Sequence, residues 1–364
     1  VTKLGCAAGS VIKEEGISKV LIGKDTRISG YMFESALQAG FISSGMDVTL
    51  LGPLPTPGVS FLANSNNQVG LVISASHNLF EDNGIKFFNK DGQKFSLELE
   101  RRIEAKLTQE MTAVESINLG KASRMNDAQG RYIEFCKSSF TNLDLSGLSI
   151  LLDCANGATY SVAPSVFSEL GATVDTIGAS PDGININQNC GSTSPDFLKE
   201  EIAEGDYDIG IAFDGDGDRI LVVSSEGTVL DGDDILYILS NDLSNESGVI
   251  GTLMTNKALE LYFEEQGINF SRADVGDKYV LNALVSNKWE LGGEPSGHII
   301  CLDAAPTGDA IIAALKLLNA IKINDFSLEK SLEGFTRFPQ TLINLKVDDP
   351  NKIILSDQFW SKVT

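Results

Sequence analysis

Short apolar runs alternate with amphipathic stretches along most of the chain. Runs rich in β-branched and aliphatic residues predict strands at Lys19 to Ile22, Val48 to Leu51, Leu71 to Ile73, Leu148 to Leu152, Thr173 to Ile177, Ile209 to Phe213, Ile220 to Val223 and Val249 to Leu253. Apolar residues at helical spacing predict helices at Glu34 to Ser44, Leu97 to Leu107, Ala163 to Leu170, Phe197 to Glu204, Lys257 to Gln266 and Asp309 to Ile321. The alternation predicts the α/β fold class.

Two polar or turn-rich segments interrupt this pattern, around Leu119 to Gln129 and around Glu226 to Asp233. They predict three consecutive α/β domains of similar size with mixed sheets, covering residues 1–128, 129–230 and 231–340. A chain of 364 residues suits two or three domains at about 150 residues each. Residues 341–364 are too few for a domain, and we interpret them as the beginning of a truncated fourth, α+β domain.

Composition narrows the class of protein. Hydrophobic residues make up 42% of the chain, but no apolar stretch reaches the roughly 18 residues of a membrane span, and the first residues lack the pattern of a signal peptide. We therefore expect a cytoplasmic protein with no membrane partner. The five cysteines are scattered and form no C-x-x-C pair, which predicts that they are reduced and mostly buried.

The net charge is strongly negative. Fifty acidic residues against 28 basic residues give a formal charge of −22, which repels nucleic acid and anionic lipid. We therefore expect no nucleic-acid partner. An anionic substrate has to be captured by local hydrogen-bond donors rather than by the field of the whole protein.

The most informative motif is Asp214-Gly215-Asp216-Gly217-Asp218, directly after the predicted strand at Ile209 to Phe213. The two glycines allow backbone conformations closed to other residues, so the three carboxylates can converge on one point. Carboxylate oxygens in such a cluster suit a hard divalent cation. The motif therefore predicts that Asp214, Asp216 and Asp218 bind Mg²⁺.

This motif has two other interpretations. An EF-hand begins in the same way, but it needs Gly at its sixth and Glu at its twelfth position, where this chain has Arg219 and Ser225. An acidic turn that joins two strands remains a simpler alternative for the motif taken alone.

A second candidate segment is Ser74-Ala75-Ser76-His77-Asn78, which follows the predicted strand at Leu71 to Ile73. The chain has only two histidines, His77 here and His298 in a glycine-rich segment, and both lie in loop-like sequence where functional residues gather. A Ser-His-Asp hydrolase is disfavoured. Adjacent residues point in different directions, and no G-x-S-x-G elbow surrounds Ser76.

These motifs, in this order, resemble the phosphoserine loop, metal loop and sugar-binding loop of the α-D-phosphohexomutases, and the resemblance spans almost the whole chain. It is carried by Ser74 to Asn78 with Asp82 to Phe88, by Asp214 to Arg219 and by Gly292 to His298, with lesser landmarks at Lys24 to Arg27, Pro55 to Pro57, Val275 to Asp277 and Thr307 to Asp309. Within the family, the segment Pro181 to Thr193 is similar to the phosphoglucosamine mutase branch.

The resemblance implies a catalytic assignment for several residues. Ser76 would carry a phosphoryl group and, with its phosphate, join the three aspartates around one Mg²⁺ per chain. Lys86 and Arg219 would lie beside the transferring group as cations, with Lys86 also a possible general acid or base, and His77 belongs to the same catalytic set. Each has a simpler alternative: a solvated lysine, a structural ion pair, or an ordinary loop histidine.

The resemblance also implies substrate contacts. Glu294 and Ser296 would bind sugar hydroxyls, and His298 would orient the loop or relay a proton. Arg27 and Lys278 would bind substrate as well. Three positions depart from the family pattern, which usually has Pro at Leu79, Gln at Pro295 and Arg at Lys278.

The implied function is interconversion of glucosamine 6-phosphate and glucosamine 1-phosphate through a hexosamine 1,6-bisphosphate, which would also act as activator. Phosphomannomutase or phosphoglucomutase activity and a non-catalytic sugar-phosphate-binding module remain alternatives. A homodimer is an expectation from the family alone. The family's opening motif and its C-terminal phosphate clamp have no match here, which predicts a fragment with doubtful activity of its own.

Overall fold

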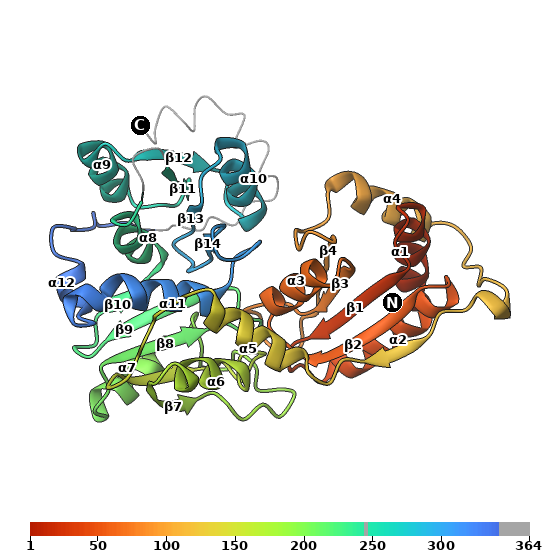
Figure 1. The fold of residues 1–364 in the computed structure, drawn as a ribbon, viewed down its shortest axis with the longest axis horizontal. Helices are drawn as coiled ribbons and strands as arrows, with labels where there is room; N and C mark the ends of the chain where they lie inside the picture. The colour runs from red at the N-terminus through yellow and green to blue at the C-terminus, as the bar shows by residue number, and fades with distance from the viewer. Residues whose placement is uncertain (244–246, 342–364) are drawn as a thin grey trace.

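The computed structural model describes residues 1–243 and 247–341, and they form three α/β units, each built on its own sheet (Figure 1). This confirms the predicted fold class. The predicted fourth domain lies almost entirely in residues 342–364, outside the described residues. In the part of the chain described here, no helix is both long and apolar enough to cross a membrane.

The first unit has a five-stranded sheet in the order β4-β3-β1-β2-β5, in which only β4 runs antiparallel to its neighbour. Its elements are α1 (Thr2–Glu14), β1 (Lys19–Lys24), α2 (Ser29–Ser43), β2 (Asp47–Pro53), α3 (Thr56–Ser65), β3 (Val69–Ile73), β4 (Ile85–Phe88), α4 (Leu97–Leu107), the 3-10 turn η1 (Ser116–Asn118) and β5 (Ala122–Arg124).

The second unit has a five-stranded sheet in the order β10-β9-β8-β6-β7, with β9 antiparallel to β8 and to β10. Its elements are α5 (Ala128–Ser138), β6 (Ser149–Asp153), α6 (Val162–Glu169), β7 (Thr173–Ile177), α7 (Asp196–Glu204), β8 (Ile209–Phe213), β9 (Ile220–Ser224) and β10 (Val229–Leu230).

The third unit has a four-stranded sheet in the order β12-β11-β13-β14, with β14 antiparallel to β13. Its elements are α8 (Gly232–Ser240), β11 (Gly248–Thr252), α9 (Lys257–Gln266), β12 (Asn269–Ala273), α10 (Asp277–Asn287), β13 (Leu291–Gly293), β14 (Ile299–Cys301), α11 (Ala310–Ile321), the 3-10 turn η2 (Lys322–Asn324) and α12 (Leu328–Ser331).

The β1 strand shows how the core is divided. Side chains alternate between the two faces of a strand, and both faces of β1 are buried. Val20 and Ile22 pack on one face into the cluster under α1 and α2, whereas Leu21 packs on the other face with α3. The cluster that contains Leu21 continues without a break through the second and third units.

Both segments predicted to be boundaries contain regular structure. Leu119 to Gln129 holds β5 and the start of α5, and Glu226 to Asp233 holds β10 and the start of α8. The three sheets nevertheless lie within residues 1–128, 129–230 and 231–340. All five cysteines are free and buried, which confirms that prediction.

Candidate active site

The site forms where parallel strands of different sheets end. The β3 strand leads at its carboxyl end into the serine loop (residues 74–84), and β8 leads into the acidic loop (residues 214–219). The β13 strand leads into the glycine-rich loop, residues 292–298. The carboxyl ends of parallel strands are the usual place for ligand sites in α/β sheets, and side chains of the three loops meet here.

Ser76 occupies the centre of the serine loop in an unusual backbone conformation. Its φ of 52° lies in the left-handed region, which is uncommon for a residue other than glycine, asparagine or aspartate. Its amide N–H donates to the Ser74 hydroxyl at 2.9 Å, and its own hydroxyl donates to Asp214 Oδ2 at 2.6 Å. The structure thus brings together the predicted nucleophile and the predicted metal ligand.

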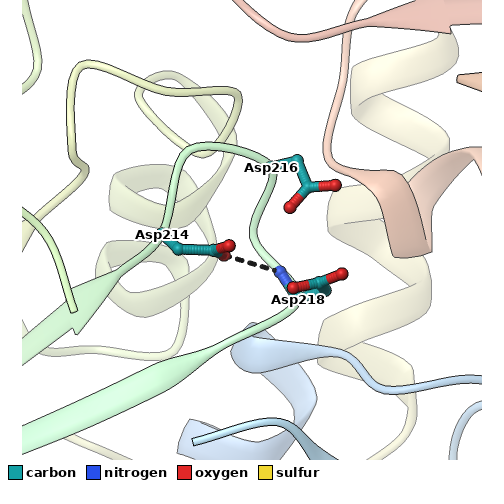
Figure 2. Close-up of side chains that lie close together, drawn as sticks. All are labelled: Asp214, Asp216 and Asp218. Carbon is teal, nitrogen blue, oxygen red and sulfur yellow. Dashed lines mark hydrogen bonds between the residues drawn. The ribbon is translucent and has the colours of Figure 1, made fainter. Parts of the chain in front are cut away.

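The acidic triad, Asp214, Asp216 and Asp218, is buried on the acidic loop, and one oxygen of each carboxylate lies within 4.8 Å of the others (Figure 2). The backbone N–H of Asp218 donates to Asp214 Oδ1 at 3.1 Å and closes the turn. Gly217 has φ 72°, as the sequence predicted for a glycine of this loop, whereas Gly215 is required for space rather than for φ.

The charges in and around the acidic triad favour the binding of a cation. Burial, reinforced by Asp218 and Asp216, raises the pKa of Asp214 well above its ordinary value. Burial alone would also raise the pKa of Asp218, but Lys86 and His298 outweigh burial and lower this pKa. Burial alone would lower the pKa of Lys86, but Asp216 and Asp218 outweigh burial and raise it. Lys86 is therefore protonated at neutral pH.

The residues fit a divalent metal ion. Oδ1 of Asp216 and Oδ1 of Asp218 are buried and have no hydrogen-bond partner among the described residues. Such oxygens are costly unless a cation or another donor satisfies them. Lys86 Nζ donates to Asp216 Oδ2 at 2.6 Å and to Asp218 Oδ2 at 3.1 Å, and it supplies only one positive charge against three carboxylates. The acidic triad can therefore hold a metal ion.

Thr56 is a site residue to which the sequence assigned no role. Its hydroxyl donates to Asp216 Oδ2, and its backbone N–H donates to the Asp216 carbonyl at 2.8 Å. Thr56 opens α3 in the first unit, whereas Asp216 belongs to the second. The Pro55-Thr56-Pro57 landmark was the only signal for it, because a contact between distant segments leaves no local pattern.

The other two predicted catalytic residues are His77 on the serine loop and Arg219 at the end of the acidic loop. Burial lowers the pKa of His77, and Arg219 adds to the effect. Nδ1 of His77 has no partner among the described residues. Arg219 Nε lies 4.0 Å from Asp218 Oδ1, and about a quarter of the Arg219 side chain is exposed. Arg219 is thus free to reach an anion in front of the triad.

The predicted substrate-binding residues of the glycine-rich loop differ in exposure. Ser296 is exposed, whereas Glu294 is buried and its Oε1 accepts from the backbone N–H of Gly276 at 2.8 Å. His298 is also buried, with Nδ1 3.7 Å from Asp218 Oδ1 and Nε2 3.8 Å from Asp277 Oδ2. His298 thus links this loop to both the acidic loop and the start of α10.

A cavity of about 480 Å³ opens beside His298, between the first and third units. Lys278 lines it from α10, with its Nζ 3.7 Å from Glu100 Oε2. Lys94 faces it from the other side and forms an ion pair with Asp277. Neither Lys94 nor the pairing of Asp277 was singled out from the sequence.

Arg27 is placed differently from what the substrate-binding prediction requires. It is 1% exposed and lies beneath the serine loop. Its Nε donates to Asp25 at 2.8 Å, and its two terminal nitrogens donate to four loop carbonyls, those of Ser76, Asn78, Leu79 and Asp82. In this conformation Arg27 supports the loop and presents no free donor to a ligand.

Comparison with known families accounts for this arrangement. Three family models match in succession: alpha/beta/alpha domain I of phosphoglucomutase/phosphomannomutase at residues 1–114, domain II at residues 130–227 and domain III at residues 231–338. The chain belongs to this family. The resemblance found in the sequence is thereby confirmed.

Close relatives define the branch of the family. The chain is 54% identical over 363 residues to a phosphoglucosamine mutase of Aeromonas salmonicida, covering 98% of this chain and 82% of the relative. It is 55% identical to a phosphoglucosamine mutase of Marinomonas sp., covering 95% of this chain and 78% of the relative. The corresponding enzyme of Legionella pneumophila is 53% identical over 96% of this chain and 78% of its own length.

Solved structures show the same fold at much lower identity. A phosphoglucomutase/phosphomannomutase family protein from Burkholderia thailandensis has a TM-score of 0.77 at 24% identity and covers 90% of this chain and 75% of its own. The N-acetylphosphoglucosamine mutase of Aspergillus fumigatus, solved with GlcNAc-6P and magnesium, has a TM-score of 0.64 at 16% identity, covering 81% and 79% respectively. These likenesses support the fold assignment.

Proposed function

We propose that this protein is a phosphoglucosamine mutase that interconverts glucosamine 6-phosphate and glucosamine 1-phosphate. The observation that carries the proposal is the identity of 53–55% to phosphoglucosamine mutases over nearly the whole chain. The geometry supports it, because Ser76 lies 2.6 Å from a buried carboxylate of a triad able to hold a metal ion. The enzyme is an isomerase that works by phosphoryl transfer.

The proposed reaction has two transfers. Phosphorylated Ser76 first gives its phosphoryl group to the free O1 of glucosamine 6-phosphate: the bond from serine oxygen to phosphorus breaks, the bond from O1 to phosphorus forms, and the O1 proton leaves. The resulting 1,6-bisphosphate turns over, and Ser76 then takes the phosphoryl group from O6. One proton passes between sugar and serine oxygens in each transfer, so the enzyme ends phosphorylated as it began.

The acidic triad would hold Mg²⁺, which neutralises charge on the transferring phosphoryl group when bound. Lys86 adds a fixed positive charge beside Asp216 and Asp218. Because its pKa is raised, Lys86 stays protonated and is suited to donate a proton or stabilise charge rather than to act as the base. Arg219, partly exposed next to Asp218, is placed to pair with phosphoryl oxygens.

Substrate recognition is assigned to the glycine-rich loop and α10. Exposed Ser296 offers a hydroxyl, and Glu294 keeps its second carboxylate oxygen for a sugar hydroxyl. His298 receives the orienting role, because it lies between two carboxylates of different segments. Lys278 supplies an ammonium at the cavity wall. A hexosamine 1,6-bisphosphate as activator, a homodimer and a cytoplasmic location remain predictions.

The decisive experiment combines mass analysis with an activity assay. The purified protein is incubated with glucosamine 1,6-bisphosphate and Mg²⁺, and the phosphorylated residue is identified by peptide mass spectrometry. We expect phosphate on Ser76 and none after Ser76→Ala. Phosphate on Ser74 in the unmodified protein would contradict the assignment, because it is the Ser76 hydroxyl that donates to Asp214 of the acidic triad.

Turnover is then measured with glucosamine 6-phosphate and, in separate and competing assays, with mannose 6-phosphate and glucose 1-phosphate. We expect glucosamine 6-phosphate to have the highest kcat/KM. Preference for mannose or glucose phosphate would move the protein to another branch of the family. Phosphorylation of Ser76 with no turnover of any hexose phosphate would indicate a sugar-phosphate-binding role instead.

A further inference from the structure

Two backbone carbonyls of the serine loop, those of Ser76 and Asn78, are each held by the same two side chains. The Nη2 of Arg27 donates to them at 3.0 and 2.8 Å. The Nδ2 of Asn187 donates to them at 2.9 and 2.8 Å. Arg27 belongs to the first unit, like the serine loop, whereas Asn187 lies 111 residues from Ser76 in the second unit.

Asn187 is itself fixed in the second unit. Its backbone N–H donates to the carbonyl of Ala155 at 2.9 Å, next to the end of β6. A few residues further on, the backbone N–H of Gly191 donates to the buried carboxylate of Asp153 at 2.6 Å, and that of Ser192 donates to the carbonyl of Phe213 at 2.9 Å. The segment that carries Asn187 is therefore anchored at the ends of β6 and β8, and β8 leads into the acidic loop.

The contact between Asn187, the serine loop and the acidic loop is close. A methyl group in place of the Gly215 hydrogen would lie 2.6 Å from Asn187 Nδ2 and 2.7 Å from the Ser76 carbonyl oxygen, a distance that real side chains do not tolerate. Asn187 is 6% exposed, and its Oδ1 has no partner among the described residues. Burying an amide with one unsatisfied oxygen costs stability, and the Nδ2 group of this amide donates to the Ser76 and Asn78 carbonyls.

The role of the Asn187 amide follows from the backbone conformation of Ser76. A left-handed backbone at a serine costs free energy and persists only where the surroundings determine it. Arg27 and the serine loop both belong to the first unit, so the bonds from Arg27 hold the loop from within that unit. The Asn187 amide is the bond that fixes the Ser76 backbone relative to the second unit, where the partner of the Ser76 hydroxyl, Asp214, resides.

We propose that Asn187 is a positioning residue for phosphoryl transfer: its side-chain amide holds the Ser76 carbonyl and thereby aims the Ser76 hydroxyl at the acidic triad. This inference rests on the proposed function, since it assigns a role in that reaction. It also gives a structural role to the segment Pro181 to Thr193, which is similar to the phosphoglucosamine mutase branch. This segment supplies the Asn187 amide. Arg27, which holds the same carbonyls from below, completes the support.

The test replaces Asn187 by Asp and by Gly in the full-length protein. Both residues tolerate the left-handed backbone of Asn187, which has φ 58°, and both lack the amide donors. Asp also places an anion against two carbonyl oxygens. Asn189 provides the matched control, because it is left-handed with φ 55° and exposed, and its side chain makes no hydrogen bond to the rest of the described chain.

We expect kcat to fall about 10- to 100-fold in the Asn187 variants, more in Asn187→Asp, because small displacements of a reacting group cost this much. The KM for glucosamine 6-phosphate should change less than about two-fold. Hydrogen exchange in peptides covering residues 74–84 should become at least about ten-fold faster. Asn189→Asp and Asn189→Gly should match the unmodified protein in all three measurements.

Several outcomes would overturn the inference: unchanged kcat in Asn187→Asp, an equal loss in the Asn189 variants, or a rise in KM with kcat retained. Hydrogen exchange separates this inference from the proposed function. If the unmodified protein did not turn over glucosamine phosphates but the Asn187 variants still loosened residues 74–84, the proposed function would fail and the positioning contact would stand. Unchanged exchange in both Asn187 variants would refute the contact itself.

Discussion

The ammonium of Lys86 lies 2.6 Å from the carboxylate of Asp216, although 130 residues separate them in the chain. Lys86 lies on β4 of the first unit, and Asp216 lies on the acidic loop of the second. The pair therefore links the two units at the point where the metal ion is proposed to bind. A protein cation and a metal cation share one set of carboxylates there, which leads to the first prediction.

Replacing Lys86 by Met should change metal affinity and catalysis in opposite directions. Removing the ammonium takes away the cation that lies 2.6 Å from Asp216 and 3.1 Å from Asp218. Because the Coulomb energy of two charges about 4 Å apart is about 4 kcal/mol, we expect the affinity for Mg²⁺ to rise at least about ten-fold. The same change should lower kcat by about 10²-fold or more, because a catalytic cation is lost. Titration calorimetry and steady-state kinetics measure the two effects. Lys90→Met, at an exposed position just beyond β4, is the control.

Replacing Asp214 by Asn and replacing Asp218 by Asn should change the stability of the metal-free protein in opposite directions. Asp214→Asn keeps an oxygen acceptor for the N–H groups of Asp218 and Arg219 and removes a buried charge with a raised pKa. We expect it to stabilise the metal-free protein by about 1 kcal/mol. Asp218→Asn breaks the pair with Lys86 and should destabilise it.

Urea unfolding in the presence of a chelator at pH 7 measures both changes, and Asp206→Asn, an exposed site, is the control. Both triad variants should also need more Mg²⁺ for activity. If Mg²⁺ dependence and phosphoryl transfer were unchanged in all three single Asp→Asn variants, the acidic loop would be only a turn.

Thr56→Val should weaken Mg²⁺ binding, because it removes a hydrogen bond to Asp216. Valine has the shape of threonine but cannot donate to Asp216 Oδ2, while the backbone bond from residue 56 remains. We expect the Mg²⁺ concentration for half-maximal activity to rise about 3- to 10-fold, as for a lost hydrogen bond to a charged group. Thr49→Val, on the exposed side of β2, should leave it unchanged; an equal effect there would mean that the loss is general.

Stability should depend on pH through Asp309, which caps α11 and accepts from the Tyr132 hydroxyl at 2.8 Å. Burial raises its pKa to about 6 from 3.8, so the folded protein binds this proton more tightly than the unfolded chain. Its contribution to stability is therefore present below about pH 4 and is lost as pH rises through 6.

Asp309→Asn keeps an oxygen to cap α11 and does not titrate. The unmodified protein should therefore lose up to about 3 kcal/mol relative to Asp309→Asn between pH 4 and 7. Urea unfolding at several pH values measures the difference. A constant difference across this range would show that Asp309 is not shifted.

Local signals in the sequence predicted much of the fold. The helix at Leu97–Leu107 was predicted to the residue from its apolar spacing, and in the structure Ser96 caps it and acidic residues lie in its first turn. By contrast, α8 was not predicted, and its first residues were placed in a boundary segment, since Asp231-Gly232-Asp233 looks like a turn. In the structure Asp231 and Asp234 form a capping box there. Short strands such as β10 and β14 lack the length that makes a pattern visible.

The candidate site was predictable where a motif lies within one loop. Ser76 and the acidic triad could be named from their own segments, and the structure brings them together. The depth of a residue could not be predicted, so Arg27 was assigned to the substrate although it lies beneath the serine loop. Contacts between units, such as those of Thr56 and Asn187, depend on how sheets dock and leave no periodic signal.

The hydrophobic cluster that runs from Leu21 through Phe213 to Leu318 passes through all three units without a break. Family models divide the chain into three domains, yet this cluster makes apolar contacts across their borders, beside the polar contacts of the site. The three units should therefore melt as one cooperative block, in a single calorimetric transition. A destabilising substitution in α11 would then also lower the stability of the serine loop. An isolated unit would expose apolar surface that its neighbours normally cover.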